Sequence, residues 1–187
     1  NEAKREVEDA WDWNCLRTSI TINTVPGIFS YDLDKANGRA RILYDRFQRA
    51  SAWNVTNKTR LRGPAPSTFM TERLINDPAE GAPMYFDING VSSDGDPLLN
   101  VWPVPDKVYQ LQLDLVVPQH DLVNASDTLR VPYWPVILGA YARAISERGE
   151  DGGVGYNEAD AHYVQALSDA IQLDNSNMPY ELVAEVI

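Results

Sequence analysis

The chain has little of what enzymes commonly use for chemistry. Its 187 residues include one cysteine and two histidines. Cys15 alone excludes an intrachain disulfide, and with His120 and His162 it gives none of the ligand spacings of a zinc site. Neither histidine stands in a motif that pairs it with a nucleophile or a carboxylate. We therefore predict no catalytic residue, no metal site and no cofactor.

Positive charge and long apolar runs are also scarce. The chain has 16 Lys and Arg residues against 27 Asp and Glu residues, a formal net charge of −11. A protein that grips phosphates needs clustered basic side chains, so this balance argues against tight DNA binding and leaves open a surface past which DNA slides. No apolar run approaches the roughly 18 residues of a membrane span, and we expect no membrane contact.

The periodicity of apolar residues changes twice along the chain. Over residues 1–13 they recur every three to four residues, which predicts a helix with one narrow apolar stripe. From residue 15 to about 120 they alternate between frequent turns, which predicts antiparallel strands. The elements expected there are a hairpin of 16–23 with 28–33, strands over 39–47, 50–57, 84–88, 98–102 and 111–117, and a short helix capped by Ser67.

The helical period returns near residue 130. Pro132 and Pro135 fall in the first turn of the next helix, where proline is tolerated, and the glycine-rich stretch 149–153 separates this helix from a second one. Such a short break makes the two helices antiparallel neighbours. The first is expected to bury Trp134, Ile137, Leu138, Tyr141, Ala144 and Ile145, and the second Ala159, Tyr163, Ala166, Leu167, Ala170 and Ile171.

These periods together predict an α+β fold. A helical bundle, made of the N-terminal helix and the C-terminal helix pair, carries an inserted and mainly antiparallel β sandwich or barrel. We expect the bundle over residues 1–14 and 128–177, the β insertion over 15–127, and a tail over 178–187. Because the chain starts without Met inside a helical pattern, we also expect residues upstream of Asn1.

The tail is apolar but has no core of its own to join. Pro179 interrupts helix propagation at its start. An apolar terminal segment of this kind is typical of an arm that binds a neighbouring protein. The residues that we predict to dock are Met178, Tyr180, Leu182, Val183, Val186 and Ile187.

One basic segment stands out from the acidic total. Lys58, Arg60 and Arg62 follow Trp53, and aromatic residues beside basic ones can stack sugars or single-stranded bases. The structural alternative is that the tryptophans fill the junction between sheet and helices while the arginines meet acidic neighbours, and the acidic total favours it.

The order of several segments resembles a known family. The segments are "DAWDW" at 9–13, "GIFSYDL" at 27–33, "GAPMYF" at 81–86, "LLNVWPVPDKVYQLQLDL" at 98–115, and "DTLRVP" at 127–132 before an alanine-rich helix. Their order is similar to that of the head-to-tail adaptor (tail tubular protein A-like) subunits of tailed phages. Related chains often carry a Leu-Pro after the second strand, and here "DLDKANGRARI" at 32–42 lacks that proline, so we expect the outer loops of the β domain to differ.

The resemblance implies a structural protein of the virion and not an enzyme. Family members form a ring, usually of twelve copies, below the portal protein; their C-terminal segment reaches the portal and their β side meets the next tail or nozzle protein. It implies assembly in the bacterial host cytoplasm, and DNA that passes the channel during ejection without specific binding. Candidate channel-lining residues are Glu150, Asp151, Glu158, Asp160 and Asp169, unless these acids simply solvate the outer wall.

Two other classes fit the same residues. A tail terminator or stopper is also a structural ring protein of the tail. A carbohydrate-binding β sandwich would use the five tryptophans of the chain.

Overall fold

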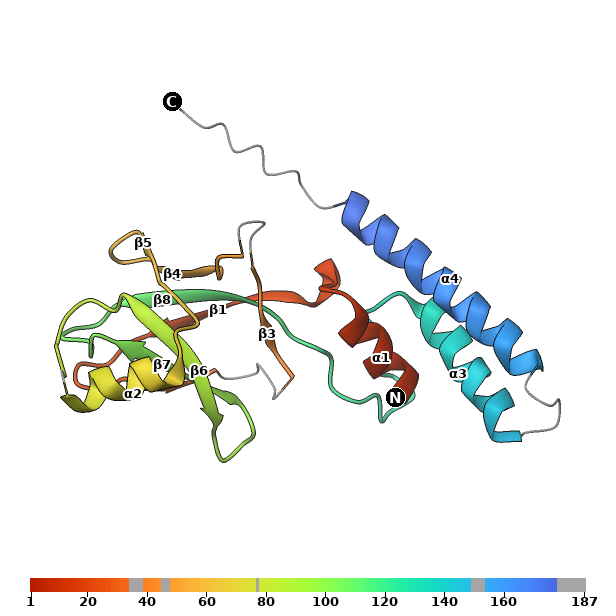
Figure 1. The fold of residues 1–187 in the computed structure, drawn as a ribbon, viewed down its shortest axis with the longest axis horizontal. Helices are drawn as coiled ribbons and strands as arrows, with labels where there is room; N and C mark the ends of the chain where they lie inside the picture. Colours follow the sequence, from red (N-terminus) through yellow and green to blue (C-terminus); the bar gives the residue numbers. More distant parts are fainter. Residues whose placement is uncertain (34–38, 45–47, 77, 149–153, 178–187) are drawn as a thin grey trace, which may run out of the picture. The chain divides into compact units, whose positions relative to one another are not determined.

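The computed structural model describes residues 1–33, 39–44, 48–76, 78–148 and 154–177. The chain divides into two compact units. We call Asn1–Leu16 with Gln119–Ile187 the helical unit, and Arg17–Pro118 the β unit. The predicted α+β class is confirmed, because helices and antiparallel sheets are both present (Figure 1).

Two antiparallel sheets form the β unit. In the first sheet β8 (Gln110–Val116) is central, with β1 (Arg17–Asn23) on one side. On its other side lie β3 (Arg41–Ile42) and β4 (Ala52–Asn54), and β5 (Thr59–Arg60) pairs with β4. In the second sheet β7 (Pro97–Trp102) lies between β2 (Ser30–Asp32) and β6 (Tyr85–Val91).

The core of the β unit lies between these sheets. Leu111, Leu113 and Leu115 alternate along β8 and are buried, as their period of two predicts. They belong to one cluster with buried side chains of β6 and β7, and this makes the unit sandwich-like. The short helix that we expected Ser67 to cap is present as α2 (Ser67–Asn76), and Ser67 is its first helical residue and not its cap.

The expected hairpin of 16–23 with 28–33 is wrong. Strand β1 pairs along its length with β8, from Arg17 opposite Val116 to Asn23 opposite Gln110, whereas β2 pairs with β7 of the other sheet. The turn at Gly27, which has a φ of +78°, therefore joins the two sheets and not two neighbouring strands. Apolar alternation decides which face of a strand is buried, but it does not decide which strand lies beside it.

The strands expected over 39–47 and 50–57 are shorter than predicted. They reduce to β3 and β4, and Tyr44 and Ala50 form only an isolated antiparallel bridge. The predicted turn at 37–38 lies outside the described residues.

The helical unit contains α1 (Glu2–Ala10), a 3-10 turn η1 (Asn14–Leu16), α3 (Tyr133–Arg148) and α4 (Val154–Ser176). Helices α1 and α4 both pack on α3 (Figure 1). Gly139 lies where the three helices meet: a Cβ there would stand 3.2 Å from the Tyr163 ring and 3.6 Å from the Ala3 Cβ. The small side chains along α3 allow this close approach.

The face that we expected α3 to bury is wrong. Its buried residues are Pro135, Gly139 and Ala142, whereas Trp134, Ile137 and Tyr141 are more than half exposed. The small residues of α3 face its neighbours, and its largest apolar side chains are left on the surface. The remaining members of the expected set are Leu138 and Ile145, which are half-buried, and Ala144, which is exposed.

The face of α4 is closer to expectation. Ala159 and Tyr163 are buried. The other four residues of the expected set, Ala166, Leu167, Ala170 and Ile171, are half-buried. One side of this apolar stripe is therefore still open to solvent.

Candidate interaction surfaces

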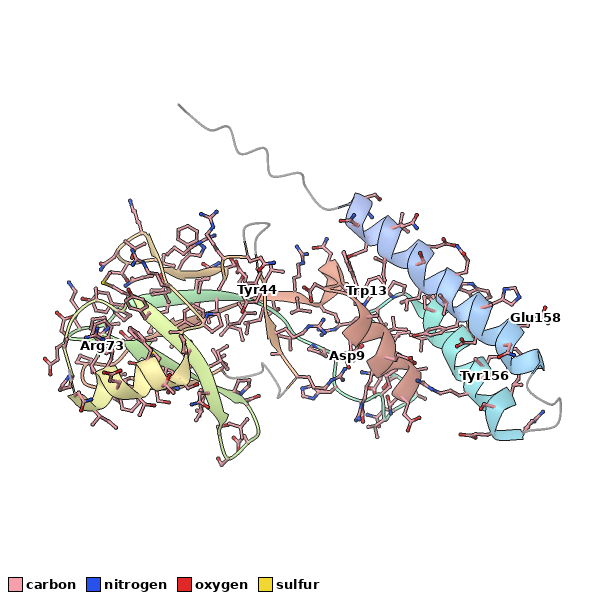
Figure 2. The ribbon with its side chains drawn as sticks, in the orientation of Figure 1. Asp9, Trp13, Tyr44, Arg73, Tyr156 and Glu158 are labelled. Carbon is pink, nitrogen blue, oxygen red and sulfur yellow. The ribbon has the colours of Figure 1, made fainter. Side chains whose placement is uncertain are left out.

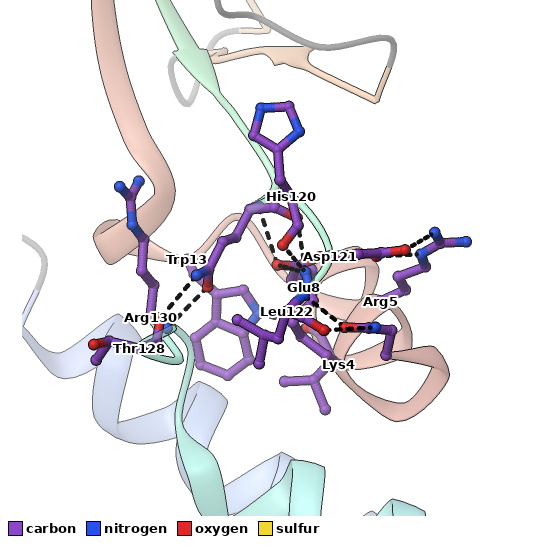
Figure 3. A network of polar contacts seen from close by, with 12 residues as sticks. Lys4, Arg5, Glu8, Trp13, His120, Asp121, Leu122, Thr128 and Arg130 are labelled. Atoms are coloured by element: carbon purple, nitrogen blue, oxygen red, sulfur yellow. Dashed lines mark hydrogen bonds and ion pairs between the residues drawn. The ribbon is translucent and has the colours of Figure 1, made fainter. Parts of the chain in front are cut away.

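A buried ion pair ties α1 to the segment that leads into α3. Lys4 and Glu8 are 2% and 0% exposed, and the Lys4 Nζ lies 3.0 Å from the Glu8 Oε1 (Figure 3). The ammonium also donates to the backbone carbonyls of Gln119 at 2.7 Å and His120 at 3.1 Å, so its three protons are used. The Glu8 Oε1 in turn accepts the Gln119 N–H at 3.1 Å. A buried charge pair needs such additional partners to offset its desolvation.

The same segment is fixed at further points. The Arg5 guanidinium donates twice to Asp121, at 3.1 and 2.6 Å, and this hydrogen bond and charge hold the pKa of Asp121 below its usual value. Asp127 accepts the N–H groups of Asn124 and Val123, both at 2.8 Å, which also lowers its pKa. The Gln119 side chain spans the turn, because it donates to the Thr128 carbonyl and accepts the Arg130 N–H. These contacts fix the conformation of the 119–130 segment and hold it against α1.

The sequence contained no visible signal for this network. Lys4 and Glu8 stand among other charges in "EAKREVED", outside the narrow apolar stripe that the sequence predicts for this helix. Residues four apart on a helix can form an ion pair on the surface as well as in the interior. The Lys4–Glu8 pair is buried because the 119–130 segment packs over it, and the sequence of the helix alone does not reveal this.

The exposed apolar side chains of α3 form a ridge. Tyr133, Ile137 and Tyr141 are spaced four residues apart and are 64%, 51% and 57% exposed. Residues at i, i+4 and i+8 form one continuous row along a helix. We call this row the α3 ridge. Monomeric proteins rarely leave such contiguous apolar surface without a use.

A groove of about 510 Å³ runs between α3 and α4. Trp134 and Leu138 line it from α3, and Ala166, Ala170 and Leu173 line it from α4. The groove also has polar lining, from His162, Gln165 and Asp169. We call it the α3–α4 groove. Because Ala166 and Ala170 are small, the α4 wall leaves room for another side chain to enter the groove.

The structure brings two of the candidate channel acids to one face. Glu158 and Asp169 are eleven residues apart, about three helical turns, and both are exposed on α4. Glu158 projects from the helix into solvent (Figure 2). Asp160 is half-buried two residues after Glu158, and residues at that spacing do not share a face. Glu150 and Asp151 lie outside the described residues.

The predicted docking tail also lies outside the described part of the chain. Helix α4 continues through Ser176, and its last turn is followed by a hydrogen bond from the Asn177 N–H to the Asp174 carbonyl at 3.2 Å. The tail therefore stays a prediction.

The arginines of the basic segment lie against aromatic rings. The Arg60 guanidinium stands 4.9 Å from the Trp53 ring centre, and that of Arg62 stands 5.8 Å from the Tyr85 ring and donates to its hydroxyl. Arg73 belongs to α2 (Figure 2), and its guanidinium stands 5.5 Å from the Phe69 ring centre and 5.4 Å from that of Trp102. Cation–π contacts of this kind stabilise the fold and occupy the ring faces that a stacking site would need.

Three of these rings form one aromatic cluster. Phe69, Tyr85 and Trp102 have ring centres 5.3 to 6.3 Å apart, so α2 packs on β6 and β7 through aromatic contacts. Gly63 approaches the sheet closely beside it, because a Cβ there would lie 2.3 Å from the Phe86 carbonyl oxygen. This part of the basic segment is therefore fixed by packing.

The remaining chemistry-bearing residues are dispersed. The pKa of the Cys15 thiol is raised, first by burial and then by the negative charge of Asp174, whereas a reactive cysteine needs a lowered one. In the part of the chain that the structure describes, His, Cys, Asp and Glu form no group of three or more that could hold a metal ion. None of the helices within those ranges combines the length and apolar character needed to span a bilayer.

The two units differ sharply in charge. Along the sequence, the β unit holds 11 Lys and Arg residues against 11 Asp and Glu, and the helical unit holds 5 against 16. The whole net charge of −11 therefore belongs to the helical unit, which also carries the α3 ridge and the α3–α4 groove.

The apolar ridge and the open groove of the helical unit indicate a protein that assembles with others. The family comparison agrees: residues 1–182 match the model of the SU10 adaptor protein family. The chain belongs to this family of phage head-to-tail adaptors, and it is a structural component of the virion. The predicted family is thereby confirmed. No curated protein matches the chain.

Proposed function

We propose that the protein is the repeating subunit of a ring that joins the portal to the tail and forms part of the DNA channel. The observation that carries this proposal is the family match over residues 1–182. The ring would hold twelve copies, with the portal on one side and a tail or nozzle protein on the other. It would assemble in the host cytoplasm and would catalyse no reaction.

The charge of the helical unit supports a channel that does not retain DNA. An acidic wall repels phosphates, so DNA slides past it without binding. Glu158 and Asp169 are suited to such a wall because they share an exposed face of α4. We propose them as lining residues together with Glu150, Asp151 and Asp160.

The test of this function is assembly on purified portal rings. The full chain, mixed with portal rings, is expected to form a complex of defined mass in which electron microscopy places one further ring beneath the portal. A ring at the far end of the tail, with no affinity for the portal, would contradict the proposal and would support a terminator.

Deletion of residues 178–187 is expected to abolish attachment to the portal. These residues hold six apolar side chains, and we propose that they dock on the portal. Co-sedimentation with portal rings measures the effect. The helical circular dichroism of the shortened chain should be unchanged.

Substitutions within the full chain provide the matched control for this deletion. Leu182→Asp with Ile187→Asp should release the protein from portal rings, whereas Glu181→Gln with Glu185→Gln should leave attachment intact. Normal attachment of the Leu182→Asp/Ile187→Asp chain would show that the tail is not the portal contact.

The purified protein is expected to show no specific binding to duplex DNA near physiological salt. Too few Lys and Arg residues cluster in the sequence to release counterions from the phosphates, and Arg60 and Arg62 lie against aromatic rings. Fluorescence anisotropy of labelled duplex measures this. Tight binding that weakens steeply with salt would contradict the prediction and would point to the basic segment at Lys58.

A further inference from the structure

The α3 ridge and the α3–α4 groove have complementary shapes. Side chains at i, i+4 and i+8 of one helix pack into the groove between rows of side chains on another. Tyr133, Ile137 and Tyr141 form such a row. Ala166 and Ala170, four residues apart on α4, keep the groove open to it. Both features lie on the same helical unit and adjoin on α3, where the Tyr133 and Trp134 ring centres are 6.4 Å apart.

We propose that the α3 ridge of one copy inserts into the α3–α4 groove of the next copy. This contact rests on the proposed function, because it names the surface that would join neighbouring subunits of the ring. The Tyr133, Ile137 and Tyr141 side chains of the first copy lie against Trp134 and Leu173 of the second.

Charge favours a second copy as the occupant. Residues 131–142, which contain the ridge, include no charged side chain. Beyond them, α3 carries Arg143 and Arg148 against the single acid Glu147. Arg143 is bound to Glu6 of α1, and Arg148 is exposed. The formal charge of α3 is therefore +1, and because Glu6 offsets Arg143, Arg148 is the basic side chain that α3 can bring to a neighbour.

Helix α4, which forms the other wall of the groove, has the opposite sign. It contains Glu158, Asp160, Asp169 and Asp174 and no Lys or Arg over its 23 residues. An α3 helix from a second copy brings apolar side chains to the groove and a complementary charge to its rim.

The contact is head-to-tail and not two-fold. The ridge and the groove are different surfaces, so each copy offers its ridge to one neighbour and its groove to another. Heterologous contacts of this type generate closed rings when the rotation between copies closes. A two-fold contact would instead place ridge against ridge and would stop at a dimer.

Three substitutions at exposed apolar positions test the contact. Ile137→Asp interrupts the ridge, and Leu173→Asp places a charge at the groove. Ile75→Asp on α2 is the matched control, because Ile75 is 71% exposed and Leu173 is 66% exposed. Each change introduces the same charge on a solvent-exposed helix position, so all three chains should fold, as circular dichroism will show.

Sedimentation velocity and native mass spectrometry, for the full chain alone and on portal rings, give the readout. Ile137→Asp and Leu173→Asp should each weaken association between copies by at least about tenfold, whereas Ile75→Asp should behave as the wild type. An equal mixture of the Ile137→Asp and Leu173→Asp chains should form a one-to-one heterodimer and nothing larger, because it retains one intact ridge and one intact groove.

Three results would overturn the interface. The first is wild-type assembly of either variant alone, and the second is a mixture that stays monomeric while the wild type assembles. The third is a wild type that binds portal rings only as separated single copies. If both variants form complete rings on the portal, the interface fails and the proposed function stands. If the wild type forms rings through the ridge but never binds the portal, the interface stands and the proposed function fails.

Discussion

Lys4→Met is expected to lower the free energy of unfolding of the helical unit by about 3–5 kcal/mol. Methionine keeps most of the length of the side chain but removes the charge and all three donors. Glu8 is fully buried and would lose its charge partner, and the carbonyls of Gln119 and His120 would lose their donor. A buried charge without a partner is far more costly than the pair was favourable. Urea unfolding, followed by the helical circular dichroism signal, measures the loss.

The neighbouring residue supplies the control. Arg5→Met removes the same charge from α1, but Arg5 and Asp121 are 53% and 39% exposed, so water solvates Asp121 when its partner is lost. We expect little change in stability from Arg5→Met. In the chain with Lys4→Met and Glu8→Leu together, no charge remains buried at this site, and stability should recover towards the wild type. If Lys4→Met were as mild as Arg5→Met, the buried pair would have no structural role.

The spacing of apolar residues predicted most helices and strands of this fold, because that spacing depends only on which face of a single element is buried. The alternation of Leu111, Leu113 and Leu115 predicted the most regular strand, and these residues are the core of the β unit. The change of period near residues 15 and 130 predicted the α+β class. Each of these inferences concerns which side of one element is apolar.

Pairing between distant segments could not be predicted in this way. Strand β1 pairs with β8 between residues that are 87 to 99 positions apart in the sequence, and an alternating strand fits either that partner or the next strand in the sequence. The turn at Gly27 is compatible with a hairpin, and the competing pairing prevailed because β8 is the central strand to which both β1 and β4 bind. Tertiary context therefore decided the topology.

The candidate surfaces were visible in the sequence but were assigned to the wrong side. We expected Trp134, Ile137 and Tyr141 to be buried because they are large and apolar at helical spacing. The structure buries Gly139 and Ala142 instead, since three helices approach one another closely there. A helix whose small and large apolar residues lie on different faces has two contact surfaces, one for its own chain and one for a partner. That distinction could have been drawn from the sequence by separating small from large apolar positions.

Apolar residues of the helical unit either stabilise the single chain or contact another copy, and substitutions of two tryptophans can distinguish these roles. Trp13 is fully buried, and its Nε1–H donates to the Val7 carbonyl at 2.6 Å. Trp13→Ala should lower the free energy of unfolding by about 3–5 kcal/mol, because it leaves a cavity and an unpaired carbonyl. Trp13→Phe, which keeps most of the ring volume and loses only the hydrogen bond, should cost less.

Trp134→Ala is expected to show the opposite behaviour. Trp134 is 55% exposed on α3 and lines the groove, so its loss should change the stability of the isolated chain by less than about 0.5 kcal/mol. It should nevertheless weaken association between copies, because the ridge of the next copy loses the largest side chain in the groove that receives it. Urea unfolding and sedimentation velocity on the same two variants measure both quantities. If Trp134→Ala lost as much stability as Trp13→Ala, or if its association between copies were unchanged, the large residues of α3 would serve the fold of the single chain and not its assembly.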